Sequence, residues 1–181
     1  MSLAVDTQMN DMGTLVLGVN WLLCAIFLHA VDHKLRAPMR FTAILAAYKV
    51  MPESLVPLAA RLVMLLECLT VLATLFAWPW GLPVAAALLL VYAFAMAVNK
   101  ARGRAYIDCG CGDTPTPLST SLLVRNGILV TLAMAASMLH GTSSFTPLGW
   151  LDIVTAAFAA AAATGLYLAF EQILANNEYL D

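Results

Sequence analysis

Charged residues are scarce in this chain. Of its 181 residues, 11% are Asp, Glu, Lys or Arg and 62% are hydrophobic, whereas a soluble domain carries about 25% charged residues. A soluble fold of this length has too little interior to bury so much apolar surface. The composition therefore excludes a soluble globular domain and indicates a membrane protein.

The sequence also lacks the alternation of polar and apolar residues that marks membrane strands. Its continuous runs of Leu, Ala and Val exclude a transmembrane β-barrel, and backbone groups in hydrocarbon then require helices. Five runs approach the roughly 17–25 residues that a helix needs to cross a bilayer. They cover 13–31, 57–78, 82–98, 121–139 and 148–174. We therefore predict an all-α, polytopic membrane bundle of about five spans, forming a single domain over 1–181.

Basic residues are absent from one side of the predicted bundle. All nine lie on the other side, at Lys34, Arg36, Arg40, Lys49, Arg61, Lys100, Arg102, Arg104 and Arg125. Because cytoplasmic loops are enriched in Lys and Arg, this side is predicted to face the cytoplasm. Asp6 and Asp11 precede the first run without any basic residue, and no small-residue cleavage pattern follows it. We therefore expect a retained helix and not a removable signal peptide.

A polar segment separates the first two runs, yet it carries apolar residues at helical spacing. These residues are Phe41, Ile44, Leu45, Tyr48 and Met51. With basic side chains among them, they predict an amphipathic helix over 37–51 that lies in the headgroup region. Prolines at positions 52 and 57 then end this helix and begin the second span.

Two features predict which helices are neighbours. The Pro79–Pro83 segment is a tight turn flanked by tryptophan, so the second and third spans are expected to pack as an antiparallel pair. The Ala156–Ala163 segment of the fifth span is rich in alanine, which lets a neighbouring helix approach closely.

The chain has four cysteines, and two of them, Cys109 and Cys111, flank Gly110 in a polar loop over 99–120. A closed zinc site needs four ligands, and no second Cys or His pair lies nearby, so we expect no metal. A disulfide within Cys-Gly-Cys needs a bent backbone, which Gly110 and Gly112 can supply. Strained, exposed disulfides are the labile and catalytic ones, and nearby arginines favour the thiolate. The pattern favours thiol–disulfide chemistry, with half of a metal site and two inert thiols as alternatives.

The other two cysteines, Cys24 and Cys68, fall near mid-depth of the first and second spans. A buried cysteine usually serves as a small hydrophobic residue. The functional alternative is an intramembrane dithiol that receives electrons from the loop pair. That relay requires the first and second spans to be adjacent.

Ionisable residues inside spans are costly and often functional. Glu67 lies in the middle of the second span, where we expect it to serve function or to organise the bundle. Arg125 and Asn126 lie about one turn into the fourth span, on the side of the cysteine loop. There Arg125 either snorkels to the surface or turns inward toward Glu67 or a thiolate. The first span ends on the same side with His29, Asp32 and His33. These three form either an ordinary helix terminus or a set of proton partners or partial metal ligands.

The segment from Arg102 to Gly112, which contains Asp-Cys-Gly-Cys-Gly, and the downstream Arg125-Asn126 resemble the signature of the methylamine utilisation MauE family. Lys34-Leu35 and Glu67 also resemble the wider DoxX-like group of small membrane proteins. The resemblance covers most of the chain. It implies that the redox pair is Cys109 and Cys111. The motif positions that support it would be Asp108, Gly110, Gly112, Arg125 and Asn126.

This resemblance implies an accessory role in maturing the small subunit of methylamine dehydrogenase, a periplasmic quinoprotein rich in disulfides. The partner would be the thioredoxin-like MauD, the location the bacterial inner membrane, and no nucleic acid is expected. If the protein is an oxidase, a quinone is the natural electron acceptor, by analogy with the DsbB and vitamin K epoxide reductase bundles. The alternatives are a non-catalytic scaffold or chaperone for MauD and its client, and a transporter coupled through Glu67.

The predictions about sidedness disagree. The basic residues place the cysteine loop in the cytoplasm, whereas the family's role implies the periplasm. Three arrangements reconcile them: an exception to the charge rule, a re-entrant loop, or transfer of reducing equivalents across the membrane. The last of these requires a relay, for which Cys24 and Cys68 are the candidates in the sequence.

Overall fold

The computed structural model describes residues 2–77, 80–110, 115–142 and 148–177, with side chains from residue 11 onward except those of 141–142 and 177. These residues form six α-helices and no strand, which confirms the all-α prediction. The helices are α1 (Ser2–Arg36), α2 (Pro38–Ala47), α3 (Val56–Phe76), α4 (Gly81–Ala101), α5 (Thr120–Thr142) and α6 (Trp150–Asn177). A short 3₁₀ helix, Glu53–Leu55, precedes α3.

Five helices in the described part of the chain are long and apolar enough to cross a bilayer, as the sequence predicts. The spans are Asp11–Arg36, Glu53–Phe76, Gly81–Ala101, Thr120–His140 and Trp150–Asn176. The third predicted run, the shortest of the five, belongs to the 21-residue helix α4. Residue 78, the predicted end of the second run, lies outside the described residues.

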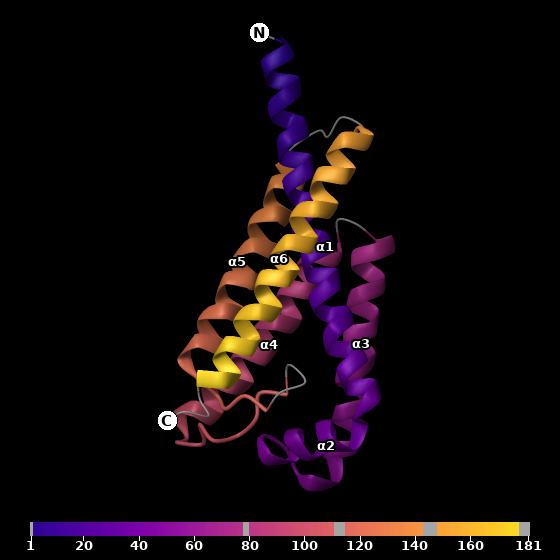
Figure 1. The fold of residues 1–181 in the computed structure, drawn as a ribbon. Helices are drawn as coiled ribbons and strands as arrows, with labels where there is room; N and C mark the ends of the chain where they lie inside the picture. The colour runs from indigo at the N-terminus through magenta and orange to yellow at the C-terminus, as the bar shows by residue number, and fades with distance from the viewer. Residues whose placement is uncertain (1, 78–79, 111–114, 143–147, 178–181) are drawn as a thin grey trace.

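The short helix α2 runs across one end of the bundle (Figure 1). It ends at Ala47, so the predicted extent of 37–51 is too long at its C-terminal end. Lys49 has a φ of 47°, a left-handed conformation that stops a helix. Proline at position 52 also disfavours a helical residue before it.

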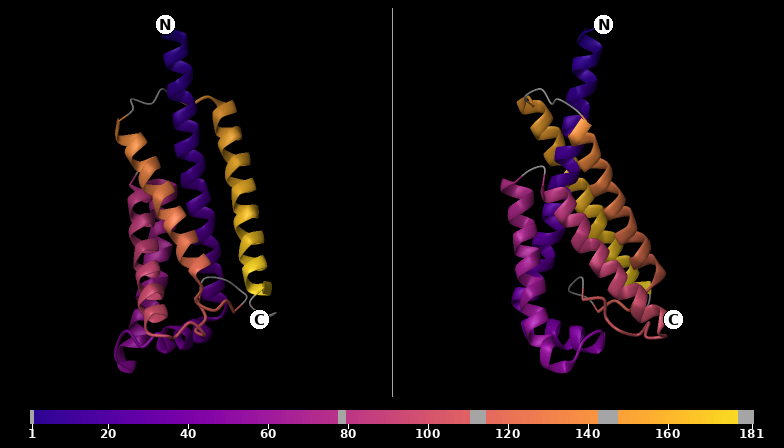
Figure 2. Two further views of the ribbon diagram at one scale, coloured as in Figure 1. Left: turned by 90° about the vertical axis from the view of Figure 1, so that its left-hand side faces the viewer. Right: turned by 180° about the vertical axis from the view of Figure 1, so that it is seen from behind.

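Helix α1 is the centre of the bundle. It packs against α3, α5 and α6, while α4 packs against α3 and α5, and Figure 2 shows α1 between α5 and α6. The main core lies along these contacts and includes Leu23, Phe27, Leu82, Leu89 and Ala133. At the α1–α6 contact the backbones are close, because a Cβ added to Gly18 would lie 3.8 Å from the carbonyl oxygen of Ala156. Small side chains therefore bring α6 close to α1, as the alanine-rich segment predicts.

Helices α3 and α4 form the predicted antiparallel hairpin. A Cβ added to Gly81, the first residue of α4, would lie 2.5 Å from the Cα of Thr74. Only glycine fits this approach. The side-chain amide of Asn20 donates a hydrogen bond of 2.8 Å to the Thr74 carbonyl oxygen, which joins α1 to the same turn.

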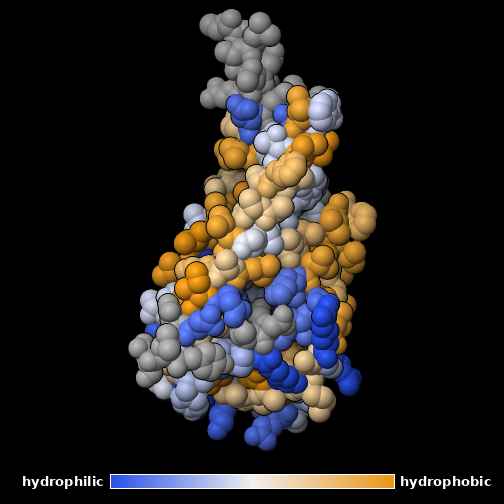
Figure 3. Space-filling view, viewed as in Figure 1, coloured by the Kyte–Doolittle hydropathy of each residue, from blue (hydrophilic) through white to orange (hydrophobic). Residues whose placement is uncertain are grey.

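The two ends of the bundle differ in polarity. Basic side chains lie at the end formed by the last turns of α1 and α4 and by α2, and α6 ends there too (Figure 1). Figure 3 shows hydrophilic side chains around this end and hydrophobic ones along the flanks. The cysteine loop between α4 and α5 therefore lies at the basic end.

Candidate functional site

The cysteine loop folds back on itself between α4 and α5. Asp108 and Pro117 form an isolated antiparallel bridge, and the Cys109 amide donates a hydrogen bond of 2.9 Å to the Thr116 carbonyl oxygen. Two short extended arms thus lie side by side. This pairing fixes the backbone on the N-terminal side of Cys109.

The carboxylate of Asp108 organises the loop. Its Oδ1 accepts hydrogen bonds from the amides of Gly110, at 3.1 Å, and Thr116, at 3.3 Å. Its Oδ2 accepts one of 3.2 Å from the guanidinium of Arg40 on α2. Hydrogen bonds to an ionised group are the stronger kind. The acid next to the cysteine therefore ties the loop both to itself and to α2.

Helix α2 also supports the cysteine directly. The hydroxyl of Tyr48 donates a hydrogen bond of 3.2 Å to the Cys109 carbonyl oxygen, and the Cys109 side chain is half-buried. Gly110 has a φ of +70°, the bend that the Cys-Gly-Cys motif predicts. A Cβ added to Gly110 would lie 3.2 Å from Cγ2 of Ile44, so glycine also makes room for α2. The other predicted motif positions, Cys111 and Gly112, lie outside the described residues.

Glu67 belongs to a buried polar cluster between α1, α3 and α4. Its Oε1 accepts a hydrogen bond of 2.8 Å from the ammonium of Lys34 and one of 2.7 Å from the hydroxyl of Tyr92. The same ammonium lies 5.0 Å from the centre of the Phe41 ring, within cation–π range. The acid that the sequence marks as costly is thus paired, with a partner from the end of the first span.

Arg125 turns inward and pairs with a helix that the sequence did not suggest. Its side chain is 6% exposed and forms an ion pair with Glu171 of α6, while its guanidinium lies 5.4 Å from the centre of the Tyr167 ring. This arrangement replaces the expected alternatives of snorkelling and of pairing with Glu67 or a thiolate. The next residue, Asn126, is 1% exposed.

These groups surround one cavity of about 210 Å³. Its walls combine residues from α1, α2, α3, α4, α5, α6 and the cysteine loop, so most of the fold contributes to it. Among its lining residues are Lys34, Phe41, Tyr48, Glu67, Tyr92, Ala95, Cys109, Gly110, Arg125, Asn126 and Tyr167. The structure therefore brings together Cys109, Gly110, Glu67, Arg125 and Asn126, five of the residues that the sequence singles out.

The titratable residues at the end of α1 take separate roles. His29 lines the cavity, His33 is buried, and Asp32 forms an exposed ion pair of 2.9 Å with Arg36 one turn later. Within the described part of the chain, no group of three or more His, Cys, Asp or Glu residues is placed to hold a metal ion.

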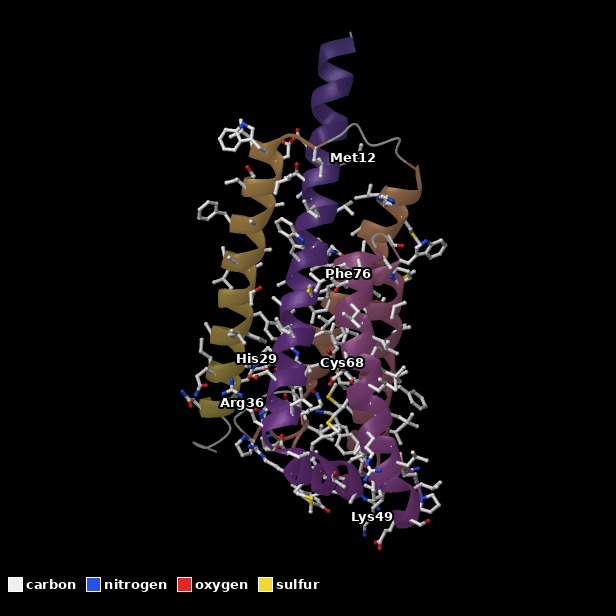
Figure 4. The ribbon with its side chains drawn as sticks, turned by 90° about the vertical axis from the view of Figure 1, so that its right-hand side faces the viewer. Met12, His29, Arg36, Lys49, Cys68 and Phe76 are labelled. Carbon is white, nitrogen blue, oxygen red and sulfur yellow. The ribbon has the colours of Figure 1, made fainter. Side chains whose placement is uncertain are left out.

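Cys24 and Cys68 lie on adjacent helices, α1 and α3, which meets one condition of the proposed relay. Figure 4 shows Cys68 and His29 nearer to the α2 end of the bundle than Phe76. Both thiols are free. Cys24 is buried in the main core and Cys68 is half-buried, and neither lines the cavity. Their role as a relay stays a prediction.

Sequence reasoning missed several residues of this site. They are Arg40, Tyr48, Tyr92, Tyr167 and Glu171. The sequence marks Lys34 by its positive charge and by the DoxX-like resemblance but does not assign it a partner, although a lysine 3% exposed in a membrane-length helix needs one. The available signal was the small number of acids inside the spans, because Glu67 and Glu171 are two of the few possible partners for buried bases.

The family model described as methylamine utilisation protein MauE matches residues 12–139. This range covers α2, α3 and α4 completely, α1 from Met12 onward and α5 up to Leu139, and it contains the cysteine loop. No curated protein and no solved structure matches the chain significantly. Helix α6, which supplies Glu171 and Tyr167, follows the matched range.

Proposed function

Because the chain belongs to the MauE family of methylamine utilisation proteins, we propose that this multi-pass membrane protein performs thiol–disulfide exchange. Its place would be the bacterial inner membrane, and its task the formation of disulfides in the small subunit of methylamine dehydrogenase. The partner would be a thioredoxin-like protein of the MauD type. Cys109 and Cys111 would be the exchanging pair.

The observation that carries this proposal is how the backbone of Cys109 is held. Its amide donates to Thr116, its carbonyl oxygen accepts from Tyr48, and Gly110 bends the chain immediately after it. Exchange requires a sulfur held in one place and a backbone that can close a small ring. A loop in which Thr116 and Tyr48 hold the backbone of Cys109 and glycine supplies the bend supports both requirements.

In the exchange reaction a partner thiolate attacks the Cys109–Cys111 disulfide. A mixed disulfide forms and the other cysteine leaves as a thiolate. A second partner thiolate then attacks the mixed disulfide, so that the partner leaves oxidised and the pair remains reduced. Two electrons pass from partner to pair, and an acceptor must later remove them.

The double variant Cys109→Ser/Cys111→Ser tests this function. Client disulfide formation and the trapped mixed disulfide with the partner should both be lost, while partner binding persists. Cys24→Ser/Cys68→Ser is the matched control, since exchange in detergent needs no transfer across a membrane. If client disulfides form at the normal rate in the first variant while the partner still binds, the protein is a scaffold and not an exchange enzyme.

A further inference from the structure

The cavity beside Cys109 has a second space next to it. A groove of about 540 Å³ lies between α5 and α6, with Leu22 of α1 at its floor. The groove and the cavity share two lining residues, Arg125 and Tyr167. Leu166 and Ile128 on the walls of the groove are 74% and 55% exposed, so the groove faces the lipid. The lipid-facing groove therefore adjoins the cavity beside Cys109, and the side chains of Arg125 and Tyr167 lie between the two spaces.

Two polar atoms on the cavity wall have no hydrogen-bond partner among the described residues. They are Oε2 of Glu67 and Nδ2 of Asn126, and their residues are 0% and 1% exposed. A buried polar group left unsatisfied costs about 1–3 kcal/mol, and such groups in native folds call for an explanation. The two residues line the cavity from different helices, α3 and α5, so a ligand that lies between them can pair with one acceptor and one donor.

We propose that the cavity binds the ring of a membrane quinone, with the apolar tail in the α5–α6 groove, and that this quinone oxidises the cysteine pair. Five aromatic side chains line the cavity, at Phe27, Phe41, Tyr48, Tyr92 and Tyr167, and suit a flat ring. A quinone carbonyl accepts a hydrogen bond from Asn126, and the hydroxyl of the reduced ring donates one to Glu67. This inference rests on the proposed function and names its electron acceptor.

The electrons and protons balance in this step. The thiols of Cys109 and Cys111 lose two electrons and two protons as their S–S bond forms. The quinone accepts the two electrons, its two oxygens accept the two protons, and the product is a hydroquinone. Cys111 lies outside the described residues and enters only as the second thiol of the proposed function, whereas every residue of the binding site is described.

Binding is tested with purified protein in lipid nanodiscs, using decylubiquinone as the probe. Asn126→Leu should weaken binding about five- to tenfold, because one hydrogen bond is lost. Ala95→Phe fills the cavity and should weaken binding by roughly tenfold or more. Ala97→Phe is the matched control, since Ala97 is exposed on the same helix and does not line the cavity. Unchanged elution and melting temperature of each variant shows that the fold is intact.

The groove is tested by the length of the tail. Ala163→Phe narrows the groove. It should weaken the binding of decylubiquinone and leave the binding of ubiquinone-0, which has no tail, unchanged. Ala162→Phe, on the neighbouring exposed position, should affect neither. If Ala163→Phe weakens the binding of both quinones equally, or of neither, the placement of the tail is overturned.

Reduction of the quinone, followed by its absorbance, separates the two proposals. Reduced wild-type protein should convert one decylubiquinone per cysteine pair, and Cys109→Ser/Cys111→Ser should bind it without reducing it. Exchange with the partner but no saturable quinone binding overturns this inference and leaves the proposed function standing. Binding that decanol matches equally well also overturns it, since the ring would then contribute nothing. Quinone binding without any partner exchange overturns the proposed function.

Discussion

Lys34 on α1 and Glu67 on α3 form an ion pair of 2.8 Å whose side chains are 4% and 0% exposed. Removing two charges from water costs several kcal/mol per ion, which the mutual attraction repays only with good geometry and further hydrogen bonds. Tyr92 supplies one such bond. Because both charged groups also line the cavity next to Cys109, the pair joins the stability of the bundle to its candidate site.

Breaking this pair should destabilise the bundle strongly. Lys34→Met leaves the Glu67 carboxylate buried without its base, and we expect a loss of about 3–5 kcal/mol in the free energy of unfolding. The double variant Lys34→Met/Glu67→Gln should regain most of this loss. Reversible unfolding in detergent micelles measures both.

The exposed pair Asp32–Arg36 on the same helix serves as the control. Arg36→Met should change the free energy of unfolding by less than about 0.5 kcal/mol, because an exposed pair one turn apart is weak. Similar values for Lys34→Met and Arg36→Met would contradict the assignment of a buried pair.

Replacing Gly110 should strain the cysteine loop. At a φ of +70°, alanine costs about 1–2 kcal/mol, and its Cβ would also press on Ile44 at 3.2 Å. We expect Gly110→Ala to lower the free energy of unfolding by more than Gly103→Ala. Gly103 has the similar φ of +73° but nothing within 4 Å of an added Cβ.

Removal of Cγ2 of Ile44 tests whether the contact with α2 causes the difference between the two glycine variants. In an Ile44→Ala background the excess loss of Gly110→Ala over Gly103→Ala should disappear. If the two glycine variants differ as much as before, the contact with α2 is not what constrains Gly110.

Asp108 should act on the cysteine through the loop. Asp108→Ala removes the acceptor for two amides and for Arg40, and each hydrogen bond to an ionised group contributes about 1.5–3 kcal/mol. We expect the loop to loosen and the rate of exchange at Cys109 to fall by roughly tenfold or more. Stopped-flow alkylation of Cys109 and the exchange assay report the two effects.

Arg40→Ala separates the contribution of the Arg40 ion pair from that of the two amide hydrogen bonds of Asp108. It removes the ion pair with Asp108 and leaves the two amide hydrogen bonds of that carboxylate in place, so its effect on exchange should be smaller than that of Asp108→Ala. An Asp108→Ala protein that exchanges at the wild-type rate would show that the loop needs no carboxylate.

The two ends of the bundle should label from opposite sides of the membrane. Three spans, in α1, α3 and α4, lie between Asp11 and Arg102. Asp11→Cys and Arg102→Cys, each in a background without the native cysteines, should therefore react with an impermeant thiol reagent from opposite faces. Both positions are exposed. The charge rule predicts that Arg102→Cys reacts from the cytoplasm.

Labelling of both positions from one face would contradict the three spans that lie between them. Labelling of Arg102→Cys from the periplasm would keep the spans and show that the charge rule fails for this chain. In that case the cysteine loop has direct access to periplasmic clients.

The five helices could be predicted from hydropathy because a helix in lipid must be apolar along its whole length. The neighbours of each helix could be predicted only where a short connection forces them together, as at the α3–α4 turn. Tight backbone approaches such as that of Gly81 to Thr74 are visible only in three dimensions, because any span contains small residues.

The local part of the site could be predicted from the sequence, whereas its long-range contacts could not. Cys109 and Gly110 carry a local motif, so their spacing in the sequence indicates their chemistry. The partners of the buried charges are non-local: 33 residues separate Lys34 from Glu67, and Arg125 reaches Glu171 on the last described helix. Charge alone does not select among possible pairs, since the packing of α1 on α3 and of α5 near α6 decides which acid comes near which base.

The packing of α6 against α1 joins the last described helix to one of the first to leave the ribosome. Before α6 is inserted, the surface of α1 around Gly18 lacks its contact with Ala156. Arg125 likewise lacks its ion pair with Glu171. Helices that insert one after another assemble afterwards in the bilayer. The described helices therefore reach their final packing only after α6 is translated, and Arg125 gains its ion pair with Glu171 at that step.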